Sequence, residues 1–431
     1  MDGLMAILLL VVLLMLGIPV AWAFAGVVAY LTLVYDVNLS TLMLQGFRSL
    51  NSVVLLSLPL FVLSGYLMQS GGIARRLVEF IEVLVRGRRG GLGASIVLAS
   101  GVFGAIAGTA TAAVAAIGTI MIDPMEQRGY PRGYSSALLG ISSLLGILIP
   151  PSITMILFAV ATQQSVAACF VASIGPGILL IIGLILFNWF SVGRLVHEKA
   201  SAALPEFTGR SPGRIAAAAL PALSLPVIIL GGIYGGIFTP TEAAAVAVLA
   251  ALIIGFLIYR DLTWGRLRES VIAAAETTGS IILILLFSFM IGRILVAERV
   301  PQELTEVVSA LVKEPIMILL AVNVFLIIAG ALIDDVSVTV VIAPLFVPLM
   351  ASVDVHPVHF ASIVAASVVI GANSPPMAPI LYMACRIGKV SVHKAVGPAL
   401  LMMAVVALPV MIITTFVPEL SLYLPRALGL L

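Results

Sequence analysis

The chain has 431 residues, of which 61% are hydrophobic and only 10% are charged, and its formal net charge at pH 7 is +2. A soluble domain has about 25% charged residues, so this composition excludes a water-facing surface and predicts a protein whose solvent is lipid. The small net charge, with no basic run among aromatic residues, gives no sign of a nucleic-acid partner. Cys169 and Cys385 lie in apolar stretches, which favours two unpaired buried thiols.

The first apolar stretch, Leu4 to Tyr35, is too long for the core of a signal peptide and has no basic residue before it. We interpret it as a retained first transmembrane helix. Further along, 17 of the 22 lysines and arginines fall in five of the connections between apolar segments. These residues are Arg75, Arg76, Arg86, Arg88, Arg89, Arg128, Arg132, Arg194, Lys199, Arg210, Arg214, Arg260, Arg266, Arg268, Arg386, Lys389 and Lys394. The positive-inside rule places these connections and the N-terminus in the cytoplasm, and the C-terminus outside.

The segment 92–122 has basic connections at both of its ends, so both ends should face the cytoplasm. Two helical arms of about 15 residues each would reach about 23 Å, which is short of the opposite membrane surface. Gly101, Gly104 and Gly108 lie near the middle, where a chain reversal would need them. We predict a re-entrant hairpin; the alternative is one tilted helix with long flanks.

A second hairpin is predicted at 315–350, whose flanks lack a basic excess and are therefore predicted to face outward. Its middle, Gly330 to Thr339, is polar where a membrane helix should be most apolar. Two hairpins that enter from opposite faces indicate an inverted repeat.

A repeated motif supports this interpretation. Each hairpin is followed by a proline, by aromatic-Pro-x-x-aromatic (with His in first place in the second copy) and by Gly-x-x-x-Pro-Pro. The first copy is Pro124, Tyr130–Tyr134 and Gly146–Pro151, and the second is Pro348, His356–Phe360 and Gly371–Pro376. Pro131 to Pro150 spans 19 positions and Pro357 to Pro375 spans 18.

The proline pairs are predicted to break two membrane helices, 135–162 and 359–385. Carbonyl groups freed in hydrocarbon cost several kcal/mol each unless they are buried in protein or given a partner. A cation bound by such carbonyls and by nearby hydroxyls is the usual resolution in secondary transporters. The alternative is a kink that serves packing only.

Polar side chains gather at the same depth. The first hairpin carries Thr109 and Thr111, and Asn373 and Ser374 lie at the second break. The second hairpin carries Asp334, Asp335, Ser337 and Thr339. Intramembrane carboxylates indicate a functional site, although the Asp pair could also lie shallower, in an outward vestibule. We expect Asp334, Asp335, Ser337, Thr339, Asn373 and Ser152 to form the substrate site.

Outside the repeats, Thr239, Pro240 and Glu242 predict a capped helix start, with Thr239 as N-cap. No Walker motif is present, and nothing in the sequence predicts an enzyme.

Several long motifs resemble the large membrane subunit of TRAP (tripartite ATP-independent periplasmic) transporters, in order over nearly the whole chain. They are Ser100–Thr111, Ala116–Met121, Gly129–Tyr130, Leu145–Ser152, Gly235–Ala245, Pro344–Pro348 and the second Pro-Pro break. The resemblance implies an elevator-type transporter in the bacterial inner membrane that imports small organic acids, commonly carboxylates, with sodium as the coupling ion and no other cofactor. It implies two partners, a small four-helix membrane subunit and a periplasmic substrate-binding protein.

The resemblance also implies two sodium sites. One would include Gly104, Gly108, Gly146 and Pro150, together with Thr109 and Thr111 from the hairpin, and the other would include Gly330, Gly371, Ser374 and Met377. The sequence departs from the family pattern at Asp334-Asp335, where one acidic residue is common, and at Ser374-Pro-Pro-Met-Ala378, where Thr-Pro-Pro-Val-Gly is common. Ser374 keeps the hydroxyl, whereas the additional Asp leaves the substrate class open.

We expect about 11 transmembrane helices and two hairpins. The predicted order is scaffold helices 1–91, a first transport repeat 92–168, scaffold helices 169–314, a second transport repeat 315–385 and a C-terminal helix in 386–431. The alternatives are a stand-alone sodium- or proton-coupled organic anion permease and a non-transporting scaffold subunit.

Overall fold

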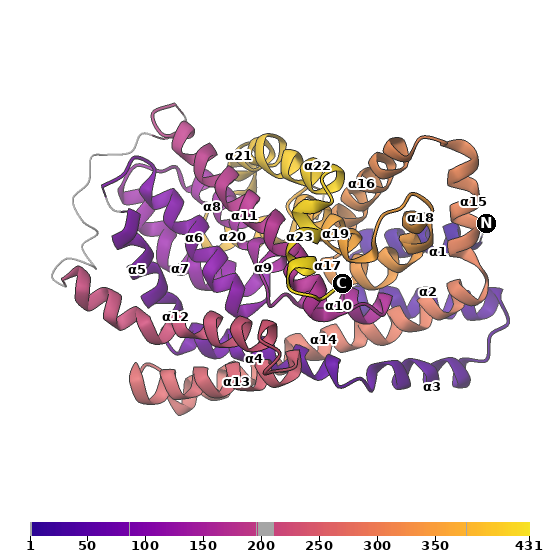
Figure 1. Ribbon diagram of the computed structural model, residues 1–431, viewed down its shortest axis with the longest axis horizontal. Helices are drawn as coiled ribbons and strands as arrows, with labels where there is room; N and C mark the ends of the chain where they lie inside the picture. The colour runs from indigo at the N-terminus through magenta and orange to yellow at the C-terminus, as the bar shows by residue number, and fades with distance from the viewer. Residues whose placement is uncertain (1, 86, 195, 197–210, 376) are drawn as a thin grey trace.

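The computed structural model describes residues 2–85, 87–194, 196, 211–375 and 377–431, and every regular element within these ranges is helical (Figure 1). Helices dominate because a chain in lipid must satisfy its backbone N–H and C=O groups within each segment. The prediction of an all-α polytopic membrane protein is confirmed. Four residues named above, Arg86, Lys199, Arg210 and Pro376, lie outside the described residues.

The N-terminal part begins with two helices where one was expected. Its elements are α1 (Asp2–Met15), α2 (Val20–Val34), α3 (Leu39–Leu50), η1 (Val54–Leu56), α4 (Ser57–Ser70) and α5 (Ile73–Val85). The single helix predicted from Leu4 to Tyr35 is therefore wrong. The chain breaks because Gly17 adopts a φ of +79° and Pro19 lacks an N–H group for a helical hydrogen bond.

The first repeat is a helical hairpin followed by a broken helix. Its elements are α6 (Gly91–Ala107), α7 (Ala110–Gln127), α8 (Arg132–Ser143), α9 (Leu145–Leu148) and α10 (Ile153–Thr162). The arms α6 and α7 pack against each other and against α8. The segments Arg132–Leu148 and Ile153–Thr162 meet at 42°, with the first proline pair between them. A broken helix thus lies where the proline pair predicted one.

The middle of the chain includes three long helical segments, α12, α13 and α14, that run along the lower edge in Figure 1. Its elements are α11 (Val166–Ser191), α12 (Pro212–Tyr234), α13 (Pro240–Ile253), η3 (Ile254–Ile258), α14 (Trp264–Ala297) and α15 (Val300–Leu311). Helix α4 packs on both α13 and α14, and α14 also packs on α2, α3 and the second hairpin. The predicted start of α13 is confirmed: Thr239 and Glu242 form a complete capping box, with Pro240 in the first turn.

The second repeat again has two arms and a broken helix. Its elements are α16 (Pro315–Leu332), α17 (Asp335–Ser337), η4 (Val338–Ile342), α18 (Ala343–Ser352), α19 (Pro357–Gly371) and α20 (Pro379–Ile387). Helix α16 packs closely on α19, and α20 packs on α7 and α8 of the first repeat. The two repeats therefore share one core.

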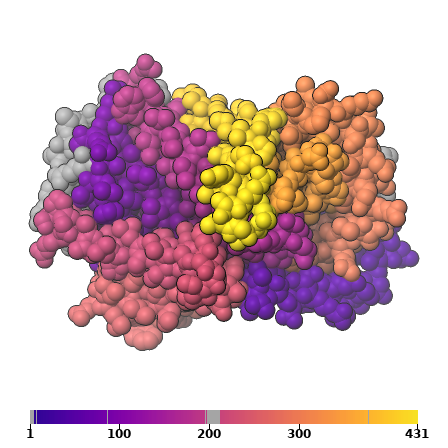
Figure 2. All heavy atoms as spheres, viewed as in Figure 1, coloured from indigo at the N-terminus to yellow at the C-terminus, as the bar shows by residue number. Residues whose placement is uncertain are grey.

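The C-terminal part holds more than the one helix expected in 386–431. Its elements are α21 (Val392–Met402), η5 (Met403–Ala407), α22 (Leu408–Phe416) and α23 (Glu419–Ala427). A single apolar stretch covers Val392–Phe416, and the chain then turns before Pro418 into α23. Helix α23 packs on α11 and α19, and the C-terminal part covers the middle of the face in Figure 2.

Seven helices among the described residues are long and apolar enough to span a membrane, or nine if each bent pair is one span. Shorter apolar helices, Val20–Val34, Gly91–Ala107 and Pro357–Gly371, fall below that length. The expected total of about 11 spans therefore stays a prediction.

Candidate functional site

The tip of the first hairpin rests on the first broken helix. Gly108 ends α6 in the left-handed conformation, with a φ of +67°, and its carbonyl accepts a 3.2 Å hydrogen bond from the Ile153 N–H. Thr109 then caps α7, its hydroxyl accepting from the Ala112 N–H at 3.3 Å. A Cβ atom at Gly108 would lie 2.7 Å from the Pro151 oxygen, so only glycine fits this turn.

The broken helix restarts beside this tip. Pro150 is buried, and Ser152 caps α10 by accepting from the Met155 N–H at 3.4 Å. The N-terminus of α10 therefore faces the tip of the first hairpin, and its dipole favours negative charge there.

The tip of the second hairpin is organised by its two carboxylates. Asp334 caps α17, accepting from the Ser337 N–H at 3.2 Å and from the Ser337 hydroxyl. Asp335 accepts a 3.1 Å bond from the hydroxyl of Thr154, and its carbonyl accepts one of 2.7 Å from Thr339. Both Asp side chains are half-buried, and Ser337 and Thr339 are buried.

One glycine contact in each repeat brings a hairpin arm against a broken helix. A Cβ atom at Gly104 would lie 2.7 Å from the Gly146 Cα, and one at Gly371 would lie 2.6 Å from the Gly330 Cα. The pairs are 42 and 41 positions apart, and each second glycine precedes its proline pair by four positions. Backbone carbonyls can approach each other at these crossings because no side chain separates the helices.

The second break places its polar residues differently. Asn373 is fully buried; its Nδ2 donates to the Gly140 carbonyl at 3.4 Å, and its Oδ1 has no partner among the described residues. The Ser374 hydroxyl donates to the Ile370 carbonyl at 2.8 Å. Pro375 and Met377 are exposed.

The structure thus brings most of the predicted residues to the two hairpin tips and the two breaks, and two side-chain hydrogen bonds among the described residues join the repeats in addition to their shared core. These are the Thr154–Asp335 bond and the Asn373–Gly140 bond. Thr111 is exposed on α7 and is not among these contacts.

Sequence reasoning missed Thr154 and Gly140. Thr154 lies two residues beyond Ser152, so a hydroxyl in the first turn after a proline pair was the available signal. No group of three or more His, Cys, Asp or Glu residues that could hold a metal ion occurs in the part of the chain that the structure describes.

Comparison with known proteins gives concordant matches. Residues 7–420 match the family described as tripartite ATP-independent periplasmic transporter, DctM component. The chain is 35% identical to the C4-dicarboxylate TRAP transporter large permease protein DctM of Pseudomonas aeruginosa, over 91% of both chains. It is 31% identical to the sialic acid TRAP transporter large permease protein SiaM of Vibrio cholerae, over 96% of both chains. The solved YdaH transporter of Alcanivorax borkumensis shares the fold alone, with a TM-score of 0.66, 13% identity and coverage of 88% of this chain and 87% of that one.

Proposed function

Because this chain belongs to the DctM component family of tripartite ATP-independent periplasmic transporters, we propose that it is the sodium-coupled subunit that imports a small organic acid. Relatives are named for C4-dicarboxylates, sialic acid and isethionate, all of which are organic anions at neutral pH. The substrate of this chain belongs to the same class of small organic anions, and within it to the carboxylates, as C4-dicarboxylates and sialic acid do.

The sodium assignment depends on one observation. In each repeat two glycine backbones pack directly against each other, Gly104 against Gly146 and Gly371 against Gly330, at equivalent places. Sodium binds oxygen, and transporters coordinate it with the carbonyls of interrupted helices. The first site takes Gly104, Gly108, Thr109, Thr111, Gly146 and Pro150, of which Thr111 is the most peripheral. The second site takes Gly330, Gly371, Ser374 and Met377, where the Ser374 hydroxyl donates to Ile370 and keeps its lone pairs for a cation.

The substrate lies between the two breaks, against Ser152, Asn373 and the second hairpin tip with Asp334, Asp335, Ser337 and Thr339. The N-terminus of α10 favours an anionic group at Ser152. The negative charges of the two aspartates would repel that group. Their carboxylates therefore contact the coupling cation or a hydroxyl of the substrate. Sodium therefore binds first and lowers the cost of admitting the anion.

The transport repeats, 92–168 and 315–385, move together as an elevator against the scaffold, 1–91 and 169–314. Their common core supports this division, since α20 of the second repeat packs on α7 and α8 of the first. A small four-helix membrane subunit and a periplasmic binding protein complete the transporter. The chain lies in the bacterial inner membrane with its N-terminus in the cytoplasm, in agreement with the basic connections.

The test is uptake into proteoliposomes that contain this chain and its small subunit, with labelled succinate, sialic acid and isethionate offered in turn with the cognate binding protein. We expect uptake of one of these acids only with an inward sodium gradient, and none with potassium. Uptake without the binding protein would instead support a stand-alone permease. Absence of uptake under every condition, with folded protein present, would support a non-transporting scaffold subunit.

A further inference from the structure

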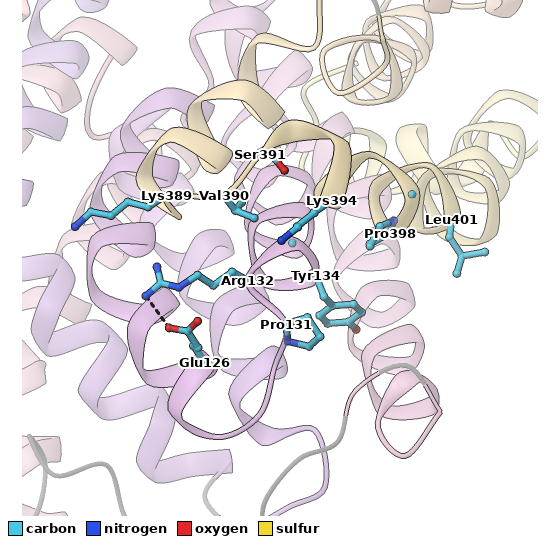
Figure 3. A pocket seen from close by; sticks show the side chains of 12 residues that line it. Glu126, Pro131, Arg132, Tyr134, Lys389, Val390, Ser391, Lys394, Pro398 and Leu401 are labelled. Carbon is cyan, nitrogen blue, oxygen red and sulfur yellow. Dashed lines mark ion pairs between the residues drawn. The ribbon is translucent and has the colours of Figure 1, made fainter.

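A cavity of about 900 Å³ lies away from the hairpin tips, where α8 and α21 begin (Figure 3). The ends of these helices cross in direct contact, because a Cβ atom at Gly133 would collide with the backbone oxygen of Lys394. The cavity is lined by charged side chains near the helix ends and by apolar ones further along α21. It is separate from the proposed sodium and substrate sites.

The positive charge of the cavity comes from two lysines. The positive charge of Arg132 is already neutralised, because its guanidinium forms ion pairs of 2.7 Å with Asp123 and with Glu126. Lys389 and Lys394 are exposed, and neither has an ion pair among the described residues. Figure 3 shows Lys394 pointing into the cavity, toward Arg132 and Tyr134. The cavity therefore has an excess of positive charge.

The backbone adds to this positive potential. Pro131 and Ser391 precede α8 and α21, and neither side chain caps its helix. Uncapped N–H groups at two helix starts favour an anion that accepts hydrogen bonds, as phosphate oxygens do.

One face of α21 continues from this charged end into the membrane. Lys394, Gly397, Pro398 and Leu401 follow one another at helical spacing and all line the cavity. Nothing lies within 4 Å of a Cβ atom placed at Gly397, so the helix leaves open space there. The apolar stretch Val392–Phe416 begins at the same end, which places Lys394 at the membrane surface and Leu401 below it.

We propose that this cavity binds an anionic phospholipid, with the headgroup phosphate on Lys389, Lys394 and the two helix starts and one acyl chain on α21 beside Gly397 and Leu401. Basic pockets between membrane helices bind anionic headgroups in this way. The apolar continuation of the groove favours a lipid over free phosphate, which shares the headgroup chemistry but has nothing to place against Leu401.

The experiment is native mass spectrometry of the purified full chain, titrated with phosphatidylglycerol, phosphatidylcholine or inorganic phosphate. We expect phosphatidylglycerol to bind at least tenfold more tightly than phosphatidylcholine. The double variant Lys389→Glu with Lys394→Glu should lose this preference, whereas Lys313→Glu, which makes the same charge change at a distant exposed lysine, should keep it. Equal binding of the two lipids, or an unchanged preference in the double variant, overturns the proposal.

A second variant separates the two sources of phosphate. Gly397→Leu fills the open space on α21 and leaves both lysines in place, so it should weaken long-chain phosphatidylglycerol at least fivefold. Binding of the short-chain dihexanoyl form should stay within twofold of wild type. If inorganic phosphate competes fully with the lipid and Gly397→Leu has no effect, the cavity is a small-anion site and the lipid assignment is wrong.

Discussion

Thr154 donates a hydrogen bond of 3.1 Å from Oγ1 to Oδ2 of Asp335. Thr154 lies in α10, just after the first proline pair, and Asp335 begins α17 at the tip of the second hairpin. The bond therefore joins the two repeats beside the proposed sodium and substrate sites. A hydrogen bond to a charged group contributes about 1.5–3 kcal/mol, which corresponds to a factor of about ten or more in an equilibrium.

Thr154→Val removes this bond with little change in volume. We expect sodium-driven uptake in proteoliposomes to lose about tenfold in kcat/KM, because the Asp335 carboxylate at the hairpin tip is no longer held against α10. Thr154→Ser keeps the hydroxyl and should stay close to wild type. Equal activity of all three proteins would show that the bond has no part in transport.

The glycine crossing of the second repeat should tolerate no side chain. Gly371→Ala would place a Cβ atom 2.6 Å from the Gly330 backbone, and overpacking of this kind costs about 1–3 kcal/mol. We expect a lower midpoint of thermal unfolding in detergent. Gly279→Ala is the matched control, since nothing lies within 4 Å of its Cβ position in α14. A midpoint that falls equally in both variants would contradict the role of the crossing.

A substitution of Asn373 should affect thermal stability and transport differently. Its Oδ1 is buried without a partner among the described residues, and the only side-chain bond that Asn373 makes to them, from Nδ2 to the Gly140 carbonyl, is long at 3.4 Å. A buried unsatisfied group costs about 1–3 kcal/mol, so Asn373→Leu should leave thermal stability unchanged or raise it. The same variant should abolish uptake if Asn373 contacts the transported ligand. Wild-type uptake by a stable Asn373→Leu protein would remove Asn373 from the site.

The capping box of α13 gives a prediction for stability. The carboxylate of Glu242 accepts hydrogen bonds of 2.8 Å from both the backbone N–H and the hydroxyl of Thr239. These bonds satisfy a backbone donor at the helix start, and the negative charge interacts favourably with the helix dipole. Glu242→Ala should therefore lower the midpoint of thermal unfolding in detergent.

Glu306→Ala is the control for that experiment, because Glu306 is also an exposed helical glutamate. It should match wild type. An equal fall of the midpoint in both variants would rule out the capping box as its cause.

Local chemistry allowed part of the fold to be predicted. The Thr239–Glu242 capping box and the break at Pro150 follow from backbone hydrogen bonding, which depends on neighbours in the sequence. The same chemistry was available at Pro19, yet the uninterrupted apolar composition around it suggested one helix. Apolar composition reports the environment of a segment, whereas glycine and proline decide whether the segment is continuous.

The contacts between repeats could not be predicted in this way. Thr154 and Asp335 are 181 positions apart, and the sequence around neither residue indicates that it contacts the other. The same holds for Asn373 and Gly140, which are 233 positions apart. The repeated Gly-x-x-x-Pro-Pro motif placed the two breaks in equivalent positions, and only the packed structure shows which side chains bridge them.

The most direct test of the central claim, that paired helix breaks form sodium sites, is thermal unfolding of the detergent-purified chain in sodium and in potassium at equal ionic strength. A ligand at a hundred times its Kd stabilises the folded state by about 2.7 kcal/mol. We predict a higher unfolding midpoint in sodium, and a smaller difference in Ser374→Ala, which loses a proposed ligand of the second site. Equal midpoints in the two salts at saturating concentration, in the presence of substrate and partner proteins, would contradict the account.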